Sequence, residues 1–166
     1  MKSSCLRTKN PTATGGFECG GSMTCGPGSA LVGETDGTGC GVENKGFCST
    51  VQTVTSSGDV FAGVHTRNCS PLPYFSCGQR ASCPEGKVLV GYSDGSACGI
   101  PSSAPCSELY TDVGNRQVVP SGCSIGSPVS CGSTSQCAAG QVMTGRVDGT
   151  GCGILNQITC CGLAVK

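Results

Sequence analysis

The sequence predicts an all-β protein built from three internal repeats, and two observations support this prediction. The first is the pattern C-G-x4-C-x2-G-x4-G-x2-D-G-x2-C-G-x6-C, which occurs over residues 19–48, 77–106 and 131–160 with no change of spacing. Its second cysteines lie at positions 25, 83 and 137, so the steps are 83 − 25 = 58 and 137 − 83 = 54 residues. The second observation is that no window shows sustained helical periodicity, in a chain that contains 28 glycines.

The elements can be predicted in chain order. Residues 1–18 are rich in Thr, Asn, Pro and Gly and predict an irregular lead-in. Each repeat then places a short β-prone run between two glycines, at 29–32, 87–90 and 141–144. An Asp-Gly pair follows each run and indicates a hairpin turn, at 36–37, 94–95 and 148–149. A second short strand is expected after each turn, at 41–42, 99–100 and 153–154.

The spacers 49–76 and 107–130 also contain extended segments, at 51–55, 59–64 and 117–119. A unit of about 55 residues buries too little surface to be stable alone, so the three repeats must share one core. We therefore expect residues 1–166 to form a single domain. Three small antiparallel sheets around a pseudo-threefold axis would give a β-prism-like arrangement, and a β-trefoil is the alternative.

The 16 cysteines approach a tenth of the chain, which is typical of a disulfide scaffold. The spacings within a repeat are C-x5-C, C-x14-C and C-x7-C, with no C-x-x-C and a single histidine, His65. These spacings favour disulfides over structural zinc. The cysteines expected in bridges are Cys5, Cys19, Cys25, Cys40, Cys48, Cys69, Cys77, Cys83, Cys98, Cys106, Cys123, Cys131, Cys137, Cys152, Cys160 and Cys161.

Five cysteines per repeat is an odd number, so at least one bridge must break the repeat symmetry. We expect that bridge to be Cys5–Cys161, which would join the two termini. The adjacent Cys160 and Cys161 are expected to have separate partners on opposite faces of a strand. Disulfides persist in oxidising compartments, so we expect an extracellular protein. Met1 is followed by polar residues and no signal peptide is visible, as in a mature form with an added start methionine.

Charge excludes some classes of function. Ten basic and ten acidic residues cancel, so the chain lacks the basic surface that nucleic-acid binding requires. No apolar run is long enough to insert into a membrane.

Residues 83–92 have the form C-P-x-G-x4-G-aromatic, from Cys83 to Tyr92, and are followed by Gly99-Ile100 and Cys106. This unit resembles the repeat of the vitelline membrane outer layer proteins, which are egg-coat proteins with three internal repeats. The resemblance covers the centre of each repeat, about half of the chain. It implies a β-prism, and the plant lectins among β-prism proteins add weight to a glycan-binding function.

The candidate binding residues are Asp36, Asp94 and Asp148, which occupy one position in all three repeats and are expected in exposed loops. Aspartate beside glycine amides can bind sugar hydroxyls, and Tyr92 can stack on a sugar ring. The alternative is that Asp-Gly is only turn chemistry and that Tyr92 is a half-buried strand residue. Calcium needs six to eight oxygen ligands, and one Asp per loop argues against it; we expect no metal and no cofactor.

Nothing in the sequence indicates catalysis, because His65 has no evident nucleophile beside it and no carboxylate pair stands out. We expect a secreted, non-enzymatic protein that recognises extracellular glycan in a lectin-like way. The alternative is a structural component of an extracellular coat, matrix or fibre that assembles with itself.

Overall fold

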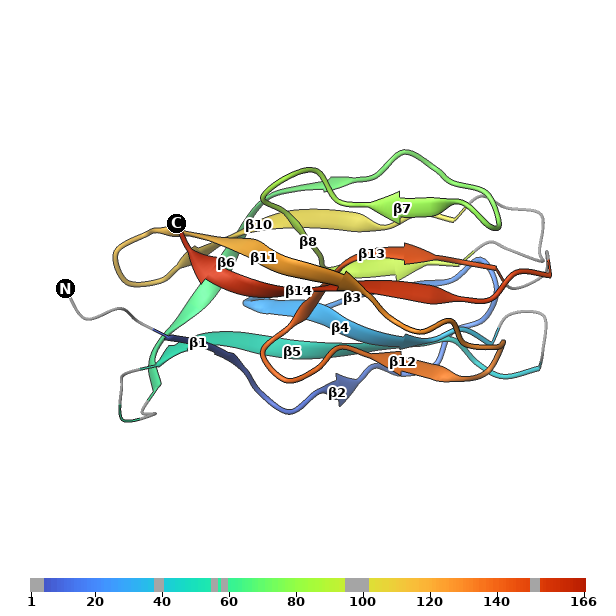
Figure 1. The fold of residues 1–166 in the computed structure, drawn as a ribbon, viewed down its shortest axis with the longest axis horizontal. Coiled ribbons are helices and arrows are strands. Elements are labelled where there is room, and N and C mark those ends of the chain that lie inside the picture. The colour runs from blue at the N-terminus through green and yellow to red at the C-terminus, as the bar shows by residue number, and fades with distance from the viewer. Residues whose placement is uncertain (1–4, 38–40, 55–56, 58–59, 95–101, 150–152) are drawn as a thin grey trace.

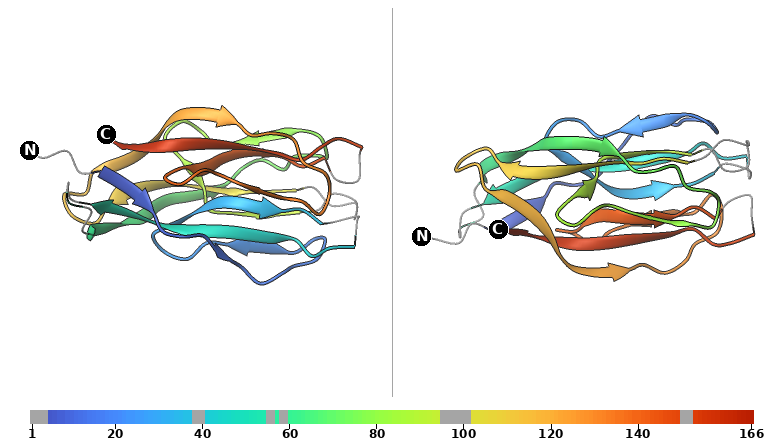
Figure 2. Two further views of the ribbon diagram at one scale, coloured as in Figure 1. Left: turned by 60° about the horizontal axis from the view of Figure 1, so that its bottom comes forward. Right: turned by 90° about the horizontal axis from the view of Figure 1, so that it is seen from above.

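The computed structural model describes residues 5–37, 41–54, 57, 60–94, 102–149 and 153–166. These residues form fourteen strands, and no helix occurs among them, which confirms the all-β prediction. The strands run roughly along the long dimension of the molecule, with β1 and the C-terminus at the same end (Figures 1 and 2).

The strand bounds follow the repeats. The first repeat and its flanks contain β1 (Cys5–Thr8), β2 (Thr12–Ala13), β3 (Ser22–Thr24), β4 (Ser29–Thr35) and β5 (Lys45–Val54). The second repeat and its flanks contain β6 (Val60–Pro71), β7 (Arg80–Ser82), β8 (Val88–Leu89), β9 (Gly91–Ser93) and β10 (Pro105–Thr111). The third repeat and its flanks contain β11 (Gln117–Ile125), β12 (Thr134–Gln136), β13 (Val142–Val147) and β14 (Gln157–Val165).

Each repeat pairs one short strand with the following repeat. β3 of the first repeat pairs with β9 of the second, β7 of the second pairs with β13 of the third, and β12 of the third pairs with β4 of the first. All three pairings are antiparallel. The exchange is therefore cyclic, and every repeat both lends a strand and receives one.

The longer strands connect the repeats into a second continuous pattern. Neighbours β4, β5, β6, β10, β11, β14 and β13 are hydrogen-bonded in that order, while β1 and β2 add to β5 and β8 adds to β10. The lead-in is thus less irregular than the composition predicts. Its residues at β1 and β2 form ladders with Val51–Val54 and with Phe47 and Cys48, because β5 is long enough to offer them a free edge.

The strands that precede the Asp-Gly pairs are buried on both faces. Equivalent side chains Ala30, Val88 and Val142 are fully buried in one apolar cluster with Val51 and Leu109. The next residues along the chain, Leu31, Leu89 and Met143, are fully buried in another cluster. Consecutive residues of a strand point to opposite faces, so each of these short strands lies between the two apolar clusters and contributes one side chain to each. This explains why they are almost wholly apolar and do not alternate.

The second apolar cluster also contains three disulfides at equivalent positions, Cys25–Cys48, Cys83–Cys106 and Cys137–Cys160, each closing 23 residues of sequence. Cys19, Cys77 and Cys131 are disulfide-bonded too. The prediction of a disulfide scaffold is confirmed for these cysteines. Cys40, Cys98, Cys152 and the side chain of Cys5 lie outside the described residues.

The predicted Cys5–Cys161 bridge is wrong, because Cys161 is bonded to Cys123. The cause is the pairing of β11 with β14, which brings Cys123 and Cys161 to a Cα–Cα distance of 4.0 Å. Cys160 and Cys161 do have separate partners, as expected. The bridge does break the symmetry. The prediction that Cys69 is bridged is wrong: Cys69, the equivalent of Cys123, is exposed and free, because Ser107 stands where the third repeat has Cys161.

The Asp-Gly pairs of the first and third repeats are not tight hairpin turns. The strands after them begin at Lys45 and Gln157, several residues later than expected, and residues 99–100 lie outside the described residues. Neither Gly37 nor Gly149 has a positive φ, which a type I′ turn would require. A Cβ there would come within 2.1 Å of the carbonyl oxygen of Val42 or of Ile154. These glycines therefore permit close backbone approach.

Candidate functional site

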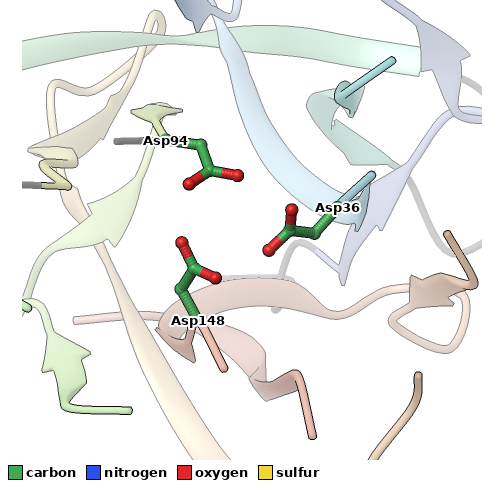
Figure 3. A group of neighbouring side chains, drawn as sticks. All are labelled: Asp36, Asp94 and Asp148. Atoms are coloured by element: carbon green, nitrogen blue, oxygen red, sulfur yellow. The ribbon is translucent and has the colours of Figure 1, made fainter. Parts of the chain in front are cut away.

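The three repeated aspartates meet inside the protein. Asp36, Asp94 and Asp148 each follow the inner strand of their repeat, β4, β9 or β13, and point toward one another (Figure 3). One carboxylate oxygen from each lies within 4.8 Å of those of the other two. All three side chains are buried, with relative exposures of 1%, 0% and 0%.

The same backbone contact holds each aspartate in place. The amide of Gly132 donates to the carbonyl oxygen of Asp36, that of Gly20 to Asp94 and that of Gly78 to Asp148, each at 2.6 Å. The three donor glycines have φ values of 85° or 86°, a conformation that strongly favours glycine. The invariant Cys-Gly pair that opens each repeat thus positions the aspartate of another repeat.

A second layer of side chains lies two residues before the aspartates. Glu34, Tyr92 and Arg146 occupy equivalent positions and are almost completely buried. The guanidinium of Arg146 donates through Nε to Glu34 Oε2 at 2.9 Å, and Nη2 lies 2.8 Å from the same oxygen. Its Nη2 and Nη1 are 3.9 Å from Asp36 Oδ2 and 4.0 Å from Asp148 Oδ2. One buried cation therefore faces carboxylates from two repeats.

Tyr92 completes this layer. Arg146 lies over its ring, with 4.4 Å between the guanidinium carbon and the ring centroid, and Phe17 contacts the ring edge-on at 5.2 Å. The phenol hydroxyl donates to the carbonyl oxygens of Lys45 at 2.9 Å and Thr35 at 3.3 Å. Burial raises the pKa of this phenol, and the nearby carboxylate of Glu34 raises it further. Tyr92 is thus a neutral, fully enclosed side chain.

Burial also governs the acidic groups. It raises the pKa of Asp36 to about 9, and hydrogen bonds with Asp148 and Asp94 act in the same direction. A hydrogen bond between two carboxyl groups needs a proton, so Asp36 shares a proton with Asp94 and Asp148 at neutral pH. Burial raises the pKa of Glu34 as well, although Arg146 opposes this. Burial alone would lower the pKa of Arg146, but the carboxylates of Glu34 and Asp148 outweigh it and keep Arg146 charged.

Three converging carboxyl groups are also a possible set of metal ligands. In this protein the proton shared by the three carboxyl groups and the charge of Arg146 already offset much of their negative charge. The cluster is therefore best understood as a polar junction of the three repeats. The residues Glu34 and Arg146 were not predicted as partners. The only signal in the sequence is that equivalent positions hold an acid, a tyrosine and a base.

The predicted exposure of the binding residues is wrong. Asp36, Asp94, Asp148 and Tyr92 are all enclosed, because the strands that carry them are covered on both faces. A sugar outside the protein cannot contact these side chains. The alternative that Asp-Gly is only turn chemistry does not describe these aspartates either, because they form a junction between repeats and not a turn. Tyr92 is a strand residue, as that alternative held, but it is fully buried and not half-buried.

The surface of the second repeat carries a cavity of about 320 Å³. The buried side chains of Phe75 and Ala81 line it, together with Tyr74, which is 76% exposed. Its remaining polar lining includes the exposed residues Gln79 and Arg80. An exposed aromatic ring beside polar donors offers both a flat apolar face and hydrogen bonds to a ligand.

A second polar surface lies on β6 and β10. His65 Nδ1 is 2.8 Å from Asp112 Oδ1, so His65 does have a carboxylate partner that the sequence did not indicate. Its Nε2 accepts from Arg67 Nε at 3.2 Å, and Arg67 lies 4.4 Å above the ring of Tyr110. Arg67 therefore occupies both the second imidazole nitrogen and one face of Tyr110.

Comparison with known proteins gives no relative: no family model, curated protein or solved structure matches the chain. Within the part of the chain that the structure describes, no helix is long and apolar enough to cross a membrane.

Proposed function

We propose that this chain is a secreted, non-enzymatic protein that recognises extracellular glycan in a lectin-like way, on a three-sided β-prism. The cyclic strand exchange supports the prism, because it treats the three repeats alike and leaves none at an end. The disulfides support secretion, since such bonds persist in oxidising compartments.

The observation that carries the proposal is the position of Tyr74 at the cavity of the second repeat. A phenol ring that is 76% exposed does not contribute much to the core, yet it lies beside a recess of about 320 Å³. That volume is within the range of about 300–1,000 Å³ found for small-ligand sites. The binding residues of this proposal are therefore Tyr74 and the cavity residues Gln79 and Arg80, and not the enclosed aspartates.

The surroundings of His65 agree with a function without catalysis. Nucleophilic catalysis needs a hydroxyl or thiol on the free nitrogen of the imidazole. In the described residues that nitrogen accepts a hydrogen bond from Arg67, an always-protonated donor. The His65–Asp112 pair thus has the orientation of a catalytic pair but no nucleophile on it.

Glycan binding by the purified full chain tests this proposal. A glycan array followed by titration should identify a ligand, and Tyr74→Ala should weaken its binding about tenfold, as loss of roughly 1.4 kcal/mol of stacking implies. Val113→Ala removes another exposed apolar side chain as a control. Asp94→Asn should leave the affinity unchanged because Asp94 is enclosed. Failure to bind any glycan, or equal binding by Tyr74→Ala, would reject the proposal.

A structural role in an extracellular coat or matrix is the second candidate, and Cys69 favours it. This cysteine is exposed and free among the described residues, whereas its equivalent in the third repeat is bridged. An exposed thiol in an oxidising compartment can join two chains. Concentrated protein that migrates as a disulfide-linked dimer without reductant, and as a monomer after Cys69→Ser, would support this candidate over the first.

A further inference from the structure

The repeats serve as internal controls for the cavity at Tyr74. The scaffold is used three times, so a residue that the fold requires should recur at equivalent positions. The buried Phe75 forms a bridge with Ser102, and Phe17 and Val129 form the equivalent bridges in the other repeats. This apolar position belongs to the fold.

Two neighbouring positions behave differently. Tyr74 corresponds to Gly16 in the first repeat (74 − 58 = 16) and to Pro128 in the third (74 + 54 = 128). Arg80 corresponds to Ser22 (80 − 58 = 22) and Thr134 (80 + 54 = 134), although all three residues begin the lent strand. The fold therefore accepts small residues at both positions. The aromatic ring and the charge of the second repeat are additions to it.

The hydrogen bonds of Arg80 leave donors for a ligand. Its Nη1 donates to Thr159 Oγ1 at 3.1 Å and its Nη2 to Gln157 Oε1 at 3.0 Å, both on β14. A guanidinium has five N–H donors, so these two bonds leave three. Both acceptors are neutral, and no carboxylate lies within ion-pair distance of Arg80 in the described ranges. Arg80 is thus held in place with its charge uncompensated.

We propose that this cavity selects acidic saccharides, with a sugar ring against Tyr74 and a sugar carboxylate on Arg80. The inference rests on the proposed glycan-binding function and adds the class of sugar. A guanidinium presents paired N–H groups that match the two oxygens of a carboxylate, and an aromatic face suits the apolar side of a sugar ring. Gln79, on the same cavity, is a further polar side chain within the lining.

The experiment uses the full oxidised chain and two matched ligands, a hyaluronan tetrasaccharide and the same tetrasaccharide with its carboxyl groups reduced to alcohols. Titration calorimetry should give an affinity for the acidic form about tenfold higher, the size expected when a charged hydrogen bond at a partly exposed site is gained. Added salt should weaken the acidic form selectively.

Variants assign that preference to a residue. Arg80→Gln should bind the two forms equally, and Arg67→Gln, which removes another exposed guanidinium and the same net charge, should keep the preference. Circular dichroism should show Arg80→Gln folded, since serine and threonine occupy the equivalent positions. A chondroitin sulfate tetrasaccharide tests whether sulfate is the group recognised.

The possible outcomes distinguish the inferred preference for acidic sugars from the proposed glycan binding on which it rests. Equal affinity for the two forms, a preference retained by Arg80→Gln, or binding that requires sulfate would overturn the acidic-sugar inference while a glycan-binding protein remained. Absence of binding to every glycan tested would overturn both. A carboxylate preference lost only in Arg80→Gln would establish the inference.

Discussion

Replacing Arg146 by methionine removes the positive charge from the junction of the three repeats. Methionine keeps much of the length and volume of the side chain, so the change is mainly electrostatic. In the native protein the guanidinium contacts Glu34 at 2.8 Å and lies 3.9 Å from Asp36 and 4.0 Å from Asp148. All of these groups are buried, so water cannot replace the lost partner.

The magnitude follows from this geometry. Removing one partner of a buried ion pair costs about 3–5 kcal/mol, because the other charge stays behind in a poorly solvating interior. The contact with the Tyr92 ring at 4.4 Å contributes up to about 2 kcal/mol more. Proton uptake by Glu34 offsets part of this loss. We expect a net loss of about 3–5 kcal/mol in the free energy of unfolding, or roughly 6–20 °C in Tm for a chain of this size.

Equilibrium unfolding in guanidinium chloride at pH 7, with the disulfides intact, measures this change. Arg116→Met is the matched control, because Arg116 is exposed and such substitutions usually change stability by no more than about 0.5 kcal/mol.

A double-mutant cycle decides whether the ion pair is the cause. Glu34→Gln combined with Arg146→Met leaves no unpaired charge in that pair, so the double variant should be more stable than the two separate losses would add up to. If the losses are additive, or if Arg146→Met costs less than about 1 kcal/mol, the reasoning from a buried ion pair is refuted.

Three further predictions concern single positions. The raised pKa of Asp36, about 9 against an ordinary 3.8, means that the folded chain holds a proton that the unfolded chain releases. This stabilisation is present below pH 3.8 and is lost as the pH rises toward 9, so chemical denaturation should show a downward slope that Asp36→Asn removes. Ser107→Cys should pair with Cys69 as the third repeat does, lowering the mass by two hydrogens and adding up to about 4 kcal/mol; a persistent free thiol would contradict this. Tyr92→Phe should cost about 1 kcal/mol in unfolding free energy through its lost hydrogen bonds, with glycan affinity unchanged, and a loss of affinity would restore Tyr92 as a binding residue.

The repeat pattern predicts the β class, the inner strands and the use of the repeated cysteines in disulfides, because spacing and apolar runs are local properties. It does not predict which cysteines pair, as the wrong Cys5–Cys161 bridge shows. It cannot predict the strand exchange, which depends on contacts between residues more than 50 positions apart. The aspartates illustrate the difference. Asp-Gly is common in exposed turns, so the sequence predicts that Asp36 and Asp148 lie in loops. Both are buried instead, because the strands that carry them are covered on both faces, and glycines of other repeats hydrogen-bond to their backbones.

The departures from symmetry were informative in a way that the repeated residues were not. Glu34 and Arg146 differ at equivalent positions because they lie beside each other and complement one another in charge. Tyr74 and Arg80 differ from their equivalents at an exposed cavity, where the fold forms with other residue types at the same positions in the other repeats. Sequence alone shows both kinds of variation but gives no means of telling a buried complement from a surface addition.

The cyclic exchange of β3, β7 and β12 fixes the number of copies at three. A solenoid can lengthen by duplication of one unit, but in this arrangement a fourth copy would interrupt the contacts between the third and the first. In a chain with a single repeat, the short strand equivalent to β3, β7 or β12 could form the same pairing only with a strand of another chain. Three separate chains of one repeat each would contain all the strands needed to close the same cycle, and the two spacers of this protein hold those three units in one chain.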